Sequence, residues 1–329
     1  MHFSHTKGEQ LMGKILFSVG GSSGLGWQDF LEICQTCDEL GFHGFYPSDH
    51  LMQIHGARGA TPARLDGLTV MAAMAGHTKN LRLGMLVINN NFRHPVMTAK
   101  IVNTIDHVSG GRAEMGIGSG NVKHEFDVHG MHFPPFSERV ERLDEALSVI
   151  KAIWHDEPAT FSGKYYSINE APQMPKPVQK PNPPIIVGGR GDRTLVIAAK
   201  HADDYNQIAP LKEAIHNLNR MQNACDAIGR DFSLMRRSVQ IQINLTDDKS
   251  LVRETIAKGA TLATQTTDFY ENPEDQVKDS MLLGEPSEII QKLNSWVEIG
   301  INHFILMTPR PFNRNMMERF AKEVIPHFE

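Results

Sequence analysis

The sequence has few cysteines, no long apolar run and no excess of basic residues, and each shortage excludes a class of protein. Three cysteines among 329 residues are too few for a disulfide framework, so we expect reduced thiols and a cytoplasmic location. No apolar stretch approaches the roughly 20 residues that cross a bilayer, so we expect no membrane partner. A net charge of −5 and a pI near 6.3 offer no basic surface to nucleic acid. A small-molecule organic partner is therefore expected.

Three segments match part of a catalytic motif but lack a required feature. Residues 20–24 fit the Gly-x-Ser-x-Gly pattern of a hydrolase, but they follow the first strand, whereas the nucleophile elbow lies after several strands. His124 and His129 are five residues apart, so on a helix they lie about 140° apart and cannot share one metal ion. Residues 116–120 lack the third glycine of a dinucleotide-binding loop, because Asn121 replaces it. We therefore expect neither a serine hydrolase nor a metal site.

Hydrophobic runs of strand length alternate with helical patterns along the chain, which is typical of a (β/α)8 barrel. The predicted strands are 14–19, 44–47, 81–89, 113–118, 184–188, 204–208, 238–244 and 303–308. The predicted helices are 27–40, 66–76, 95–109, 137–154, 194–201, 212–228, 249–258, 286–298 and 315–325. The fold class is therefore α/β, a TIM barrel formed by residues 14–329 after an N-terminal extension at 1–13. Near 155–180 and 262–283 the alternation stops, and we expect long loop insertions there.

The segment 185–206 carries the most information about a ligand. An apolar strand pattern ends at two glycines, the acidic residue Asp192 follows as a candidate N-cap, and a helical pattern begins at Thr194. This order exposes backbone N–H groups at the positive end of a helix, where a phosphate group binds well. A tight turn without a ligand fits the same spacing. The residues predicted to bind the phosphate are Gly188, Gly189, Arg190 and Gly191.

Motifs at five places along the chain fit one known pattern. They are 45–52 at the end of the second strand, 83–87, 92–95, 109–120 and 183–191. Together they resemble the bacterial luciferase-like superfamily from Lys14 to Phe328. Within it they resemble the branch of deazaflavin (coenzyme F420)-dependent oxidoreductases, to which Phe161-x-Gly163-x-Tyr165-Tyr166 and 175–179 also correspond.

This resemblance implies a TIM barrel of the luciferase type that holds coenzyme F420 or reduced FMN at the C-terminal ends of its strands. With F420 the expected reaction is hydride transfer to or from a small organic substrate. With FMN it is an oxygen-using monooxygenase reaction, supplied by a separate flavin reductase. A second alternative is a non-catalytic flavin-binding protein, against which the presence of both Asp49 and His50 argues. A homodimer is also expected.

The resemblance also assigns roles to individual residues. It places Asp49 and His50 beside the cofactor ring. We expect His50 to be held by a carboxylate or carbonyl partner and to act on the substrate as hydrogen-bond donor or proton carrier. It implies a cis peptide between Leu86 and Val87 behind the ring. Further cofactor contacts are expected from Asn89, Ser119 and His124.

The chain departs from the pattern at Asn121. F420-dependent dehydrogenases of the sugar-phosphate and alcohol type carry a glutamate there as proton donor, and an amide cannot donate a catalytic proton. His124 or Glu125 could substitute, whereas a monooxygenase would not need that acid, so the choice between F420 and FMN stays open. The catalytic candidates are therefore His50, Asp49, Asn121 and Glu125.

Overall fold

The computed structural model describes residues 13–21, 25–52, 64–262 and 269–329, and within them eight parallel strands close into a barrel. In order around the barrel these strands are β1 (Leu16–Gly20), β2 (Gly44–Tyr46), β3 (Arg82–Gly84), β5 (Ala113–Gly118), β8 (Ile185–Gly188), β9 (Asp204–Gln207), β10 (Arg236–Leu245) and β12 (His303–Met307). Pairing of β12 with both β10 and β1 closes the ring. The predicted TIM barrel is confirmed, and each of the eight predicted strands contributes a barrel strand.

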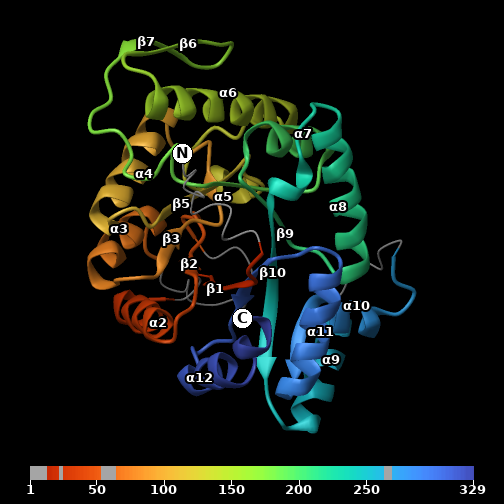
Figure 1. The fold of residues 1–329 in the computed structure, drawn as a ribbon. Coiled ribbons are helices and arrows are strands. Elements are labelled where there is room, and N and C mark those ends of the chain that lie inside the picture. The colour runs from red at the N-terminus through yellow and green to blue at the C-terminus, as the bar shows by residue number, and fades with distance from the viewer. Residues whose placement is uncertain (1–12, 22–24, 53–63, 263–268) are drawn as a thin grey trace, which may run out of the picture.

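Helices surround the barrel (Figure 1). They are α2 (Trp27–Glu39), α3 (Gly67–His77), α4 (Pro95–Ser109), α5 (Lys123–Val128), α6 (Phe136–His155), α7 (Asp192–His201), α8 (Leu211–Asp226), α9 (Lys249–Leu262), α10 (Pro273–Ser280), α11 (Pro286–Glu298) and α12 (Arg314–Glu323), with 3-10 turns at Phe232–Leu234 and Ile325–Phe328. All nine predicted helices are present with small differences at their ends. In the described part of the chain, no helix is both long and apolar enough to cross a membrane.

Helix α6 shows how the sequence builds this outer layer. Val140, Leu143, Leu147, Ile150 and Trp154 recur at helical spacing, and all five are buried. Burial of each such side chain contributes about 1.5–3 kcal/mol. The helix therefore covers the barrel with one apolar face and leaves its charged face in solvent.

The structure differs from the predictions at three places. The expected single strand 81–89 is two short strands, β3 and β4 (Ile88–Asn89), and β4 pairs with β5. The segment 155–180, expected as a loop, contains the antiparallel hairpin of β6 (Ala159–Ser162) and β7 (Ser167–Ala171). The segment 262–283 contains α10 and most of β11 (Met281–Gly284), which pairs with β10. These elements have two to eight residues, too few for a periodic pattern to identify. Residues 1–12 and 263–268 lie outside the described residues.

The interior of the barrel is filled by side chains from facing strands. Tyr46, Leu86, Ile186 and Ile305 form an apolar cluster of their own, separate from the core between barrel and helices. Glycine makes room for it, because a Cβ at Gly84 would lie 2.4 Å from the Tyr46 ring. Since this packing closes the centre, a ligand can enter only beyond it, at the C-terminal ends of the strands, where barrel enzymes have their sites.

Candidate active site

His50 lies in the loop after β2 and pairs with Glu125 of the short helix α5. The His50 Nδ1 is 3.1 Å from Oε2 of Glu125. Glu125 is fully buried, and its other oxygen, Oε1, accepts hydrogen bonds from the backbone N–H groups of Leu51 and Met52. Because a carboxylate only accepts, Nδ1 carries the hydrogen and Nε2 of the neutral ring is left as an acceptor. Burial lowers the pKa of His50 below 6.5, although Glu125 opposes the shift. The expected carboxylate partner of His50 is therefore Glu125.

Asp49 faces a different set of partners from its neighbour. It is buried and forms two hydrogen bonds with Arg93, at 2.6 and 3.1 Å, while Oδ2 also accepts the backbone N–H of Asn89 at 3.0 Å. Arg93 extends the link to Asp66, which caps α3. Asp49 thereby ties the loop after β2 to the end of β4, which fixes the position of Asn89.

The break between β3 and β4 brings Val87 to the mouth of the barrel. The peptide bond between Leu86 and Val87 is cis, as the resemblance implies. A Cβ at Gly118 would lie 2.8 Å from the Val87 side chain, and one at Gly188 would lie 3.6 Å from it. Val87 therefore occupies space that two glycines, at the ends of β5 and β8, leave open.

Asn89 and Ser119 are brought together by Asn91, which the sequence reasoning did not single out. The Asn91 amide nitrogen donates to the Asn89 side-chain oxygen at 2.9 Å and to the Ser119 carbonyl at 2.8 Å. Gly120, with φ of +73°, allows this approach, since a Cβ there would lie 2.7 Å from the Asn89 oxygen. Asn89 is thus held in one orientation at the rim.

The glycine-rich loop after β8 leads into α7, but its cap differs from the prediction. Gly191, in extended backbone, is the N-cap, so the prediction that Asp192 is the N-cap is wrong, and no side chain of the described residues caps the helix. Asp192 lies in the first turn and pairs with Arg220. The backbone N–H groups at this helix start therefore have no side-chain cap, as an anion site requires. Arg190 pairs with Glu213 of α8.

The remaining predicted site residues, near the start of α5, differ in how far they are buried. Asn121 and His124 are exposed at the start of α5, whereas Glu125, one position further, is fully buried against His50. Of the two residues that could substitute for the missing acid, only Glu125 is hydrogen-bonded to His50.

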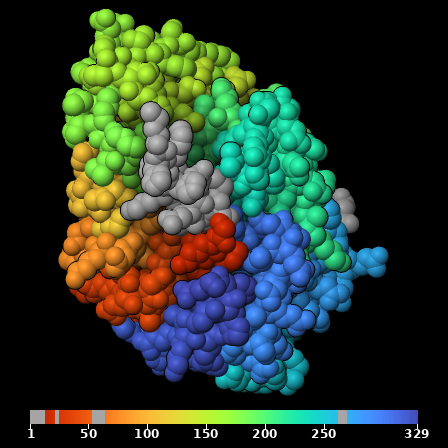
Figure 2. Space-filling model, viewed as in Figure 1, coloured from red at the N-terminus to blue at the C-terminus, as the bar shows by residue number. Residues whose placement is uncertain are grey.

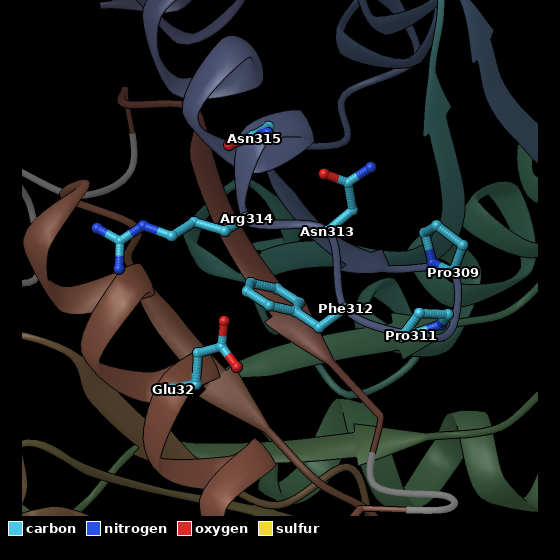
Figure 3. Close-up of a pocket in the computed structure, with 7 residues that line it drawn as sticks. All are labelled: Glu32, Pro309, Pro311, Phe312, Asn313, Arg314 and Asn315. Atoms are coloured by element: carbon cyan, nitrogen blue, oxygen red, sulfur yellow. The ribbon is translucent and has the colours of Figure 1, made fainter.

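Two hollows differ in their relation to these residues. One of about 510 Å³ is lined by residues 90–94, by Arg142 of α6, by the loop before α6 and by Tyr166 of the hairpin. It therefore includes Arg93 and begins one residue after Asn89. The other, of about 430 Å³, lies between Glu32 of α2 and the chain from Pro309 to Asn315 (Figure 3). No predicted site residue lines this second hollow. Figure 2 shows that the N-terminal, middle and C-terminal parts of the chain all reach the face viewed in Figure 1.

A buried polar network inside the barrel was not predicted. Arg236 of β10 bonds both Glu114 of β5 and Asp204 of β9, and His303 of β12 also contacts Asp204. Burial alone would raise the pKa of Glu114, but Arg236 and Arg82 hold it well below its ordinary range. The available signal was the alternation of polar and apolar residues in β10, which is unusual in a strand buried on both faces.

Comparisons with known proteins identify the family and support the fold. The family model described as luciferase-like monooxygenase matches residues 12–303. An F420-dependent glucose-6-phosphate dehydrogenase from Amycolatopsis mediterranei is 25% identical over 325 residues, covering 92% of this chain and 94% of the relative. Two solved structures share the fold. A coenzyme F420-dependent tetrahydromethanopterin reductase from Methanopyrus kandleri has a TM-score of 0.81 and 19% identity, covering 96% of this chain and all of that one. An F420-dependent secondary alcohol dehydrogenase with an F420-acetone adduct has a TM-score of 0.80 and 20% identity, covering 96% and 99%.

Proposed function

Because the chain belongs to the luciferase-like monooxygenase family, we propose that it is an F420-dependent oxidoreductase that transfers a hydride to or from a small organic substrate. The observation that carries the proposal is the His50–Glu125 pair, a neutral imidazole with a free nitrogen at the mouth of the barrel. The relative that is named an F420-dependent dehydrogenase, matched along nearly its whole length, adds support.

The residues at the mouth fit a planar ring joined to a phosphate. Gly20, Gly118 and Gly188 end β1, β5 and β8, and a Cβ at Gly20 would lie 2.9 Å from Ile305 and Met307. Beside them, Val87 and Asn89 provide an apolar surface and an oriented amide for the ring. The uncapped start of α7 provides backbone N–H donors for the phosphate.

Coenzyme F420, when bound, supplies a carbon centre that exchanges a hydride and does not activate oxygen. In oxidation of an alcohol, the substrate loses a hydride from carbon and a proton from oxygen. His50 accepts that proton at Nε2, while Glu125 holds the other nitrogen and stabilises the imidazolium that forms. In the reverse direction the same nitrogen returns the proton.

Asp49 and Glu125 are therefore positioning residues, which act by holding neighbouring groups in place. Asp49 is engaged by Arg93 and by the Asn89 backbone, so it positions the amide that faces the ring. Glu125 is engaged by two backbone N–H groups and orients His50. Asn121 is exposed and cannot supply a proton, so in this proposal His50 is the group that moves one.

An FMN-dependent monooxygenase is the second candidate. It is favoured by Asn121, because oxygen activation on a reduced flavin does not need the acid that dehydrogenases carry at that place. In that case a separate reductase would supply reduced FMN. For either function we propose a homodimer in the cytoplasm, a location that three buried free cysteines support. Sedimentation of the purified chain tests the homodimer.

Titration of the purified chain with F420 and with FMN, followed by anaerobic assays on alcohols and sugar phosphates, tests the function. We expect tighter binding of F420, and loss of the oxidised F420 absorbance when a substrate is added without oxygen. Binding of FMN alone, with oxygen consumption once it is reduced, would favour the monooxygenase. Binding of F420 with no turnover on any of these substrates or with oxygen would favour a non-catalytic binding protein.

A further inference from the structure

Strand β10 carries a row of polar side chains along the inside of the barrel. Its apolar residues Val239, Ile241 and Ile243 are buried in the core under the helices. The alternate residues are Arg236, Ser238, Gln240 and Gln242. Along this row Ser238 is buried, Gln240 is half-buried and Gln242 is exposed. Since barrel interiors are dominated by bulky apolar side chains, this row is a polar path from the buried network to the mouth.

A chain of hydrogen bonds follows this path. The Ser238 hydroxyl donates to Oδ1 of Asp204 at 2.7 Å, the Asn206 amide nitrogen donates to the Ser238 oxygen at 2.9 Å, and the Gln240 amide nitrogen donates to the Asn206 oxygen at 3.1 Å. These three links join β10 with β9 inside the barrel.

The carboxylate at the base sets the direction of every link. Asp204 is paired with Arg236, so it is ionised and only accepts. Ser238 must therefore donate to it, which leaves the hydroxyl oxygen to accept from Asn206. Asn206 consequently presents its oxygen to the amide nitrogen of Gln240. The chain ends at Gln240, whose amide nitrogen is engaged by Asn206, so its carbonyl oxygen is the group left over. The charge of Asp204, three hydrogen bonds away, fixes this assignment.

This carbonyl oxygen lies at the candidate site. Among the described residues no donor bonds to it, and its side chain is half-buried at the mouth. Its partner Asn206 has its amide oxygen 3.8 Å from the place of a Cβ on Gly188, and that Cβ would be 3.6 Å from Val87. The free acceptor is therefore next to the residues that would surround the ring.

We infer that the Gln240 carbonyl accepts a hydrogen bond from an O–H or N–H group of the ligand in the barrel mouth, and that Ser238 and Asn206 are its positioning residues. The inference rests on the proposed function, because that function places a ligand there. The donor is either the imide N–H of the cofactor ring or a hydroxyl of the substrate. A half-buried acceptor without a donor costs binding energy, so the site discriminates against ligands that lack one.

Replacement of Gln240 by leucine tests the inference and identifies the donor. We expect Gln240→Leu to melt near the wild-type temperature and to lose about tenfold, either in the dissociation constants of F420 and FMN or in KM for an alcohol that the wild type oxidises. Loss of cofactor affinity assigns the ring N–H, and a raised KM with unchanged cofactor affinity assigns the substrate hydroxyl. The matched control is Gln291→Leu, at an exposed glutamine of the outer helix α11, which should change neither constant. Unchanged constants in Gln240→Leu overturn the inference.

The variant Gln240→Glu tests whether the hydrogen bonds between Asp204 and Gln240 run in one fixed direction. When protonated, the introduced carboxyl can donate to Asn206 and present its carbonyl outward, as glutamine does. We expect ligand affinity near wild type at low pH that falls as pH rises, while the wild-type affinity stays constant. Ser238→Ala, which breaks the chain but keeps Gln240, should give a smaller loss than Gln240→Leu. An affinity of Gln240→Glu that matches wild type at every pH contradicts the fixed direction.

If the wild type binds neither F420 nor FMN, the proposed function fails and this inference with it. Equal binding by wild type and Gln240→Leu, with equal KM, overturns only this inference.

Discussion

Of the described histidines that pair with carboxylates, His50 and His303 have surroundings that differ most in solvent access. At the mouth His50 pairs with Glu125, and inside the barrel His303 lies 2.8 Å from Ser18 Oγ and 3.3 Å from Asp204. The inner group has the order serine, histidine, aspartate of a hydrolase triad. Yet Ser18, His303 and Asp204 are each 0% exposed, so no substrate can reach the serine.

The two histidines differ in solvent access and in whether one ring nitrogen is left without a protein partner. Both ring nitrogens of His303 are engaged by the protein, and burial lowers its pKa. The His50 side chain is 23% exposed and keeps Nε2 free within the described residues. A histidine hydrogen-bonded to a carboxylate is therefore no sign of catalysis by itself, since its end of the barrel decides whether it can act.

The inner group belongs to the polar network that supports the barrel. Buried charges are tolerated there because each has opposite charges or donors around it, as Arg236 has with Glu114 and Asp204. Removal of one partner leaves the others buried and unpaired, which is far more costly than the intact network. Changes inside the barrel should consequently act on stability, and changes at the mouth on turnover or binding.

The largest expected effect is on stability, from Arg236→Met. The variant keeps the length of the side chain but leaves two buried carboxylates without their shared cation, which costs about 3–5 kcal/mol. Urea unfolding followed by circular dichroism measures the loss. The exposed pair of Arg314 and Glu39 offers a control, because Arg314→Met should change stability by less than about 1 kcal/mol. An equally small change in Arg236→Met would show that the network does not support the fold.

At the other end of the barrel, His50→Ala should lower turnover by about 10²–10⁴-fold while fold and cofactor affinity stay largely intact. The side chain makes little core contact, and its loss removes the proton acceptor. Steady-state kinetics with bound F420 and a melting curve provide the two readouts. The matched variant His303→Asn should show the opposite pattern, with lower stability and near-normal turnover of the folded molecules. If His50→Ala instead destabilises the protein and leaves turnover intact, the assignment of the two histidines is reversed.

The sequence was sufficient for the barrel because its strands are apolar runs separated by helices such as α6, whose spacing is unambiguous. It also predicted that the loop at Gly188 leads from a strand into a helix and, through a motif, that His50 follows the second strand, while their roles in binding and catalysis stay predictions. The pairing of His50 with Glu125 could not be predicted from the sequence. Glu125 lies 75 positions away, and only closure of the barrel and the six-residue helix α5 bring the two together. Glu125 was considered as a proton donor, and its contacts indicate an orienting role.

The inner network was missed for a related reason. The segment of β10 was read as a strand from its apolar residues alone, so the alternating Arg236, Ser238 and Gln240 were not interpreted. Asp49 was predicted beside the ring, but its contact with Arg93 depends on side-chain geometry that spacing does not encode. Sequence patterns thus identify which end of the barrel is used, whereas the pairing of charges needs the structure.

At the start of α7, a substitution at Gly191 can test the effect of an added charge without adding backbone strain. Gly189 has φ of +146° and no room for a Cβ beside Thr194, so a substitution there would disturb folding. Gly191 has φ of −74°, and a Cβ would meet nothing closer than 3.8 Å. Gly191→Asp should cap the helix yet repel a phosphate, lowering F420 affinity by about tenfold relative to the neutral control Gly191→Asn. Equal affinities of the two variants in equilibrium titrations would contradict the phosphate site.

The smallest expected effect is a displacement of the pH profile. Turnover that needs the neutral imidazole of His50 rises with pH through the pKa of that group and is constant above it. Because burial lowers this pKa below 6.5, the acid limb should have its midpoint below 6.5. Glu125 raises the pKa through its hydrogen bond and its charge, so Glu125→Gln should move the midpoint to still lower pH and also reduce the plateau. The measurement is turnover against pH at saturating F420, with F420 affinity determined at each pH as the control. If Glu125→Gln leaves the midpoint unchanged, another group titrates. The His50–Glu125 pair would then take no part in catalysis, like the His303–Asp204 pair inside the barrel.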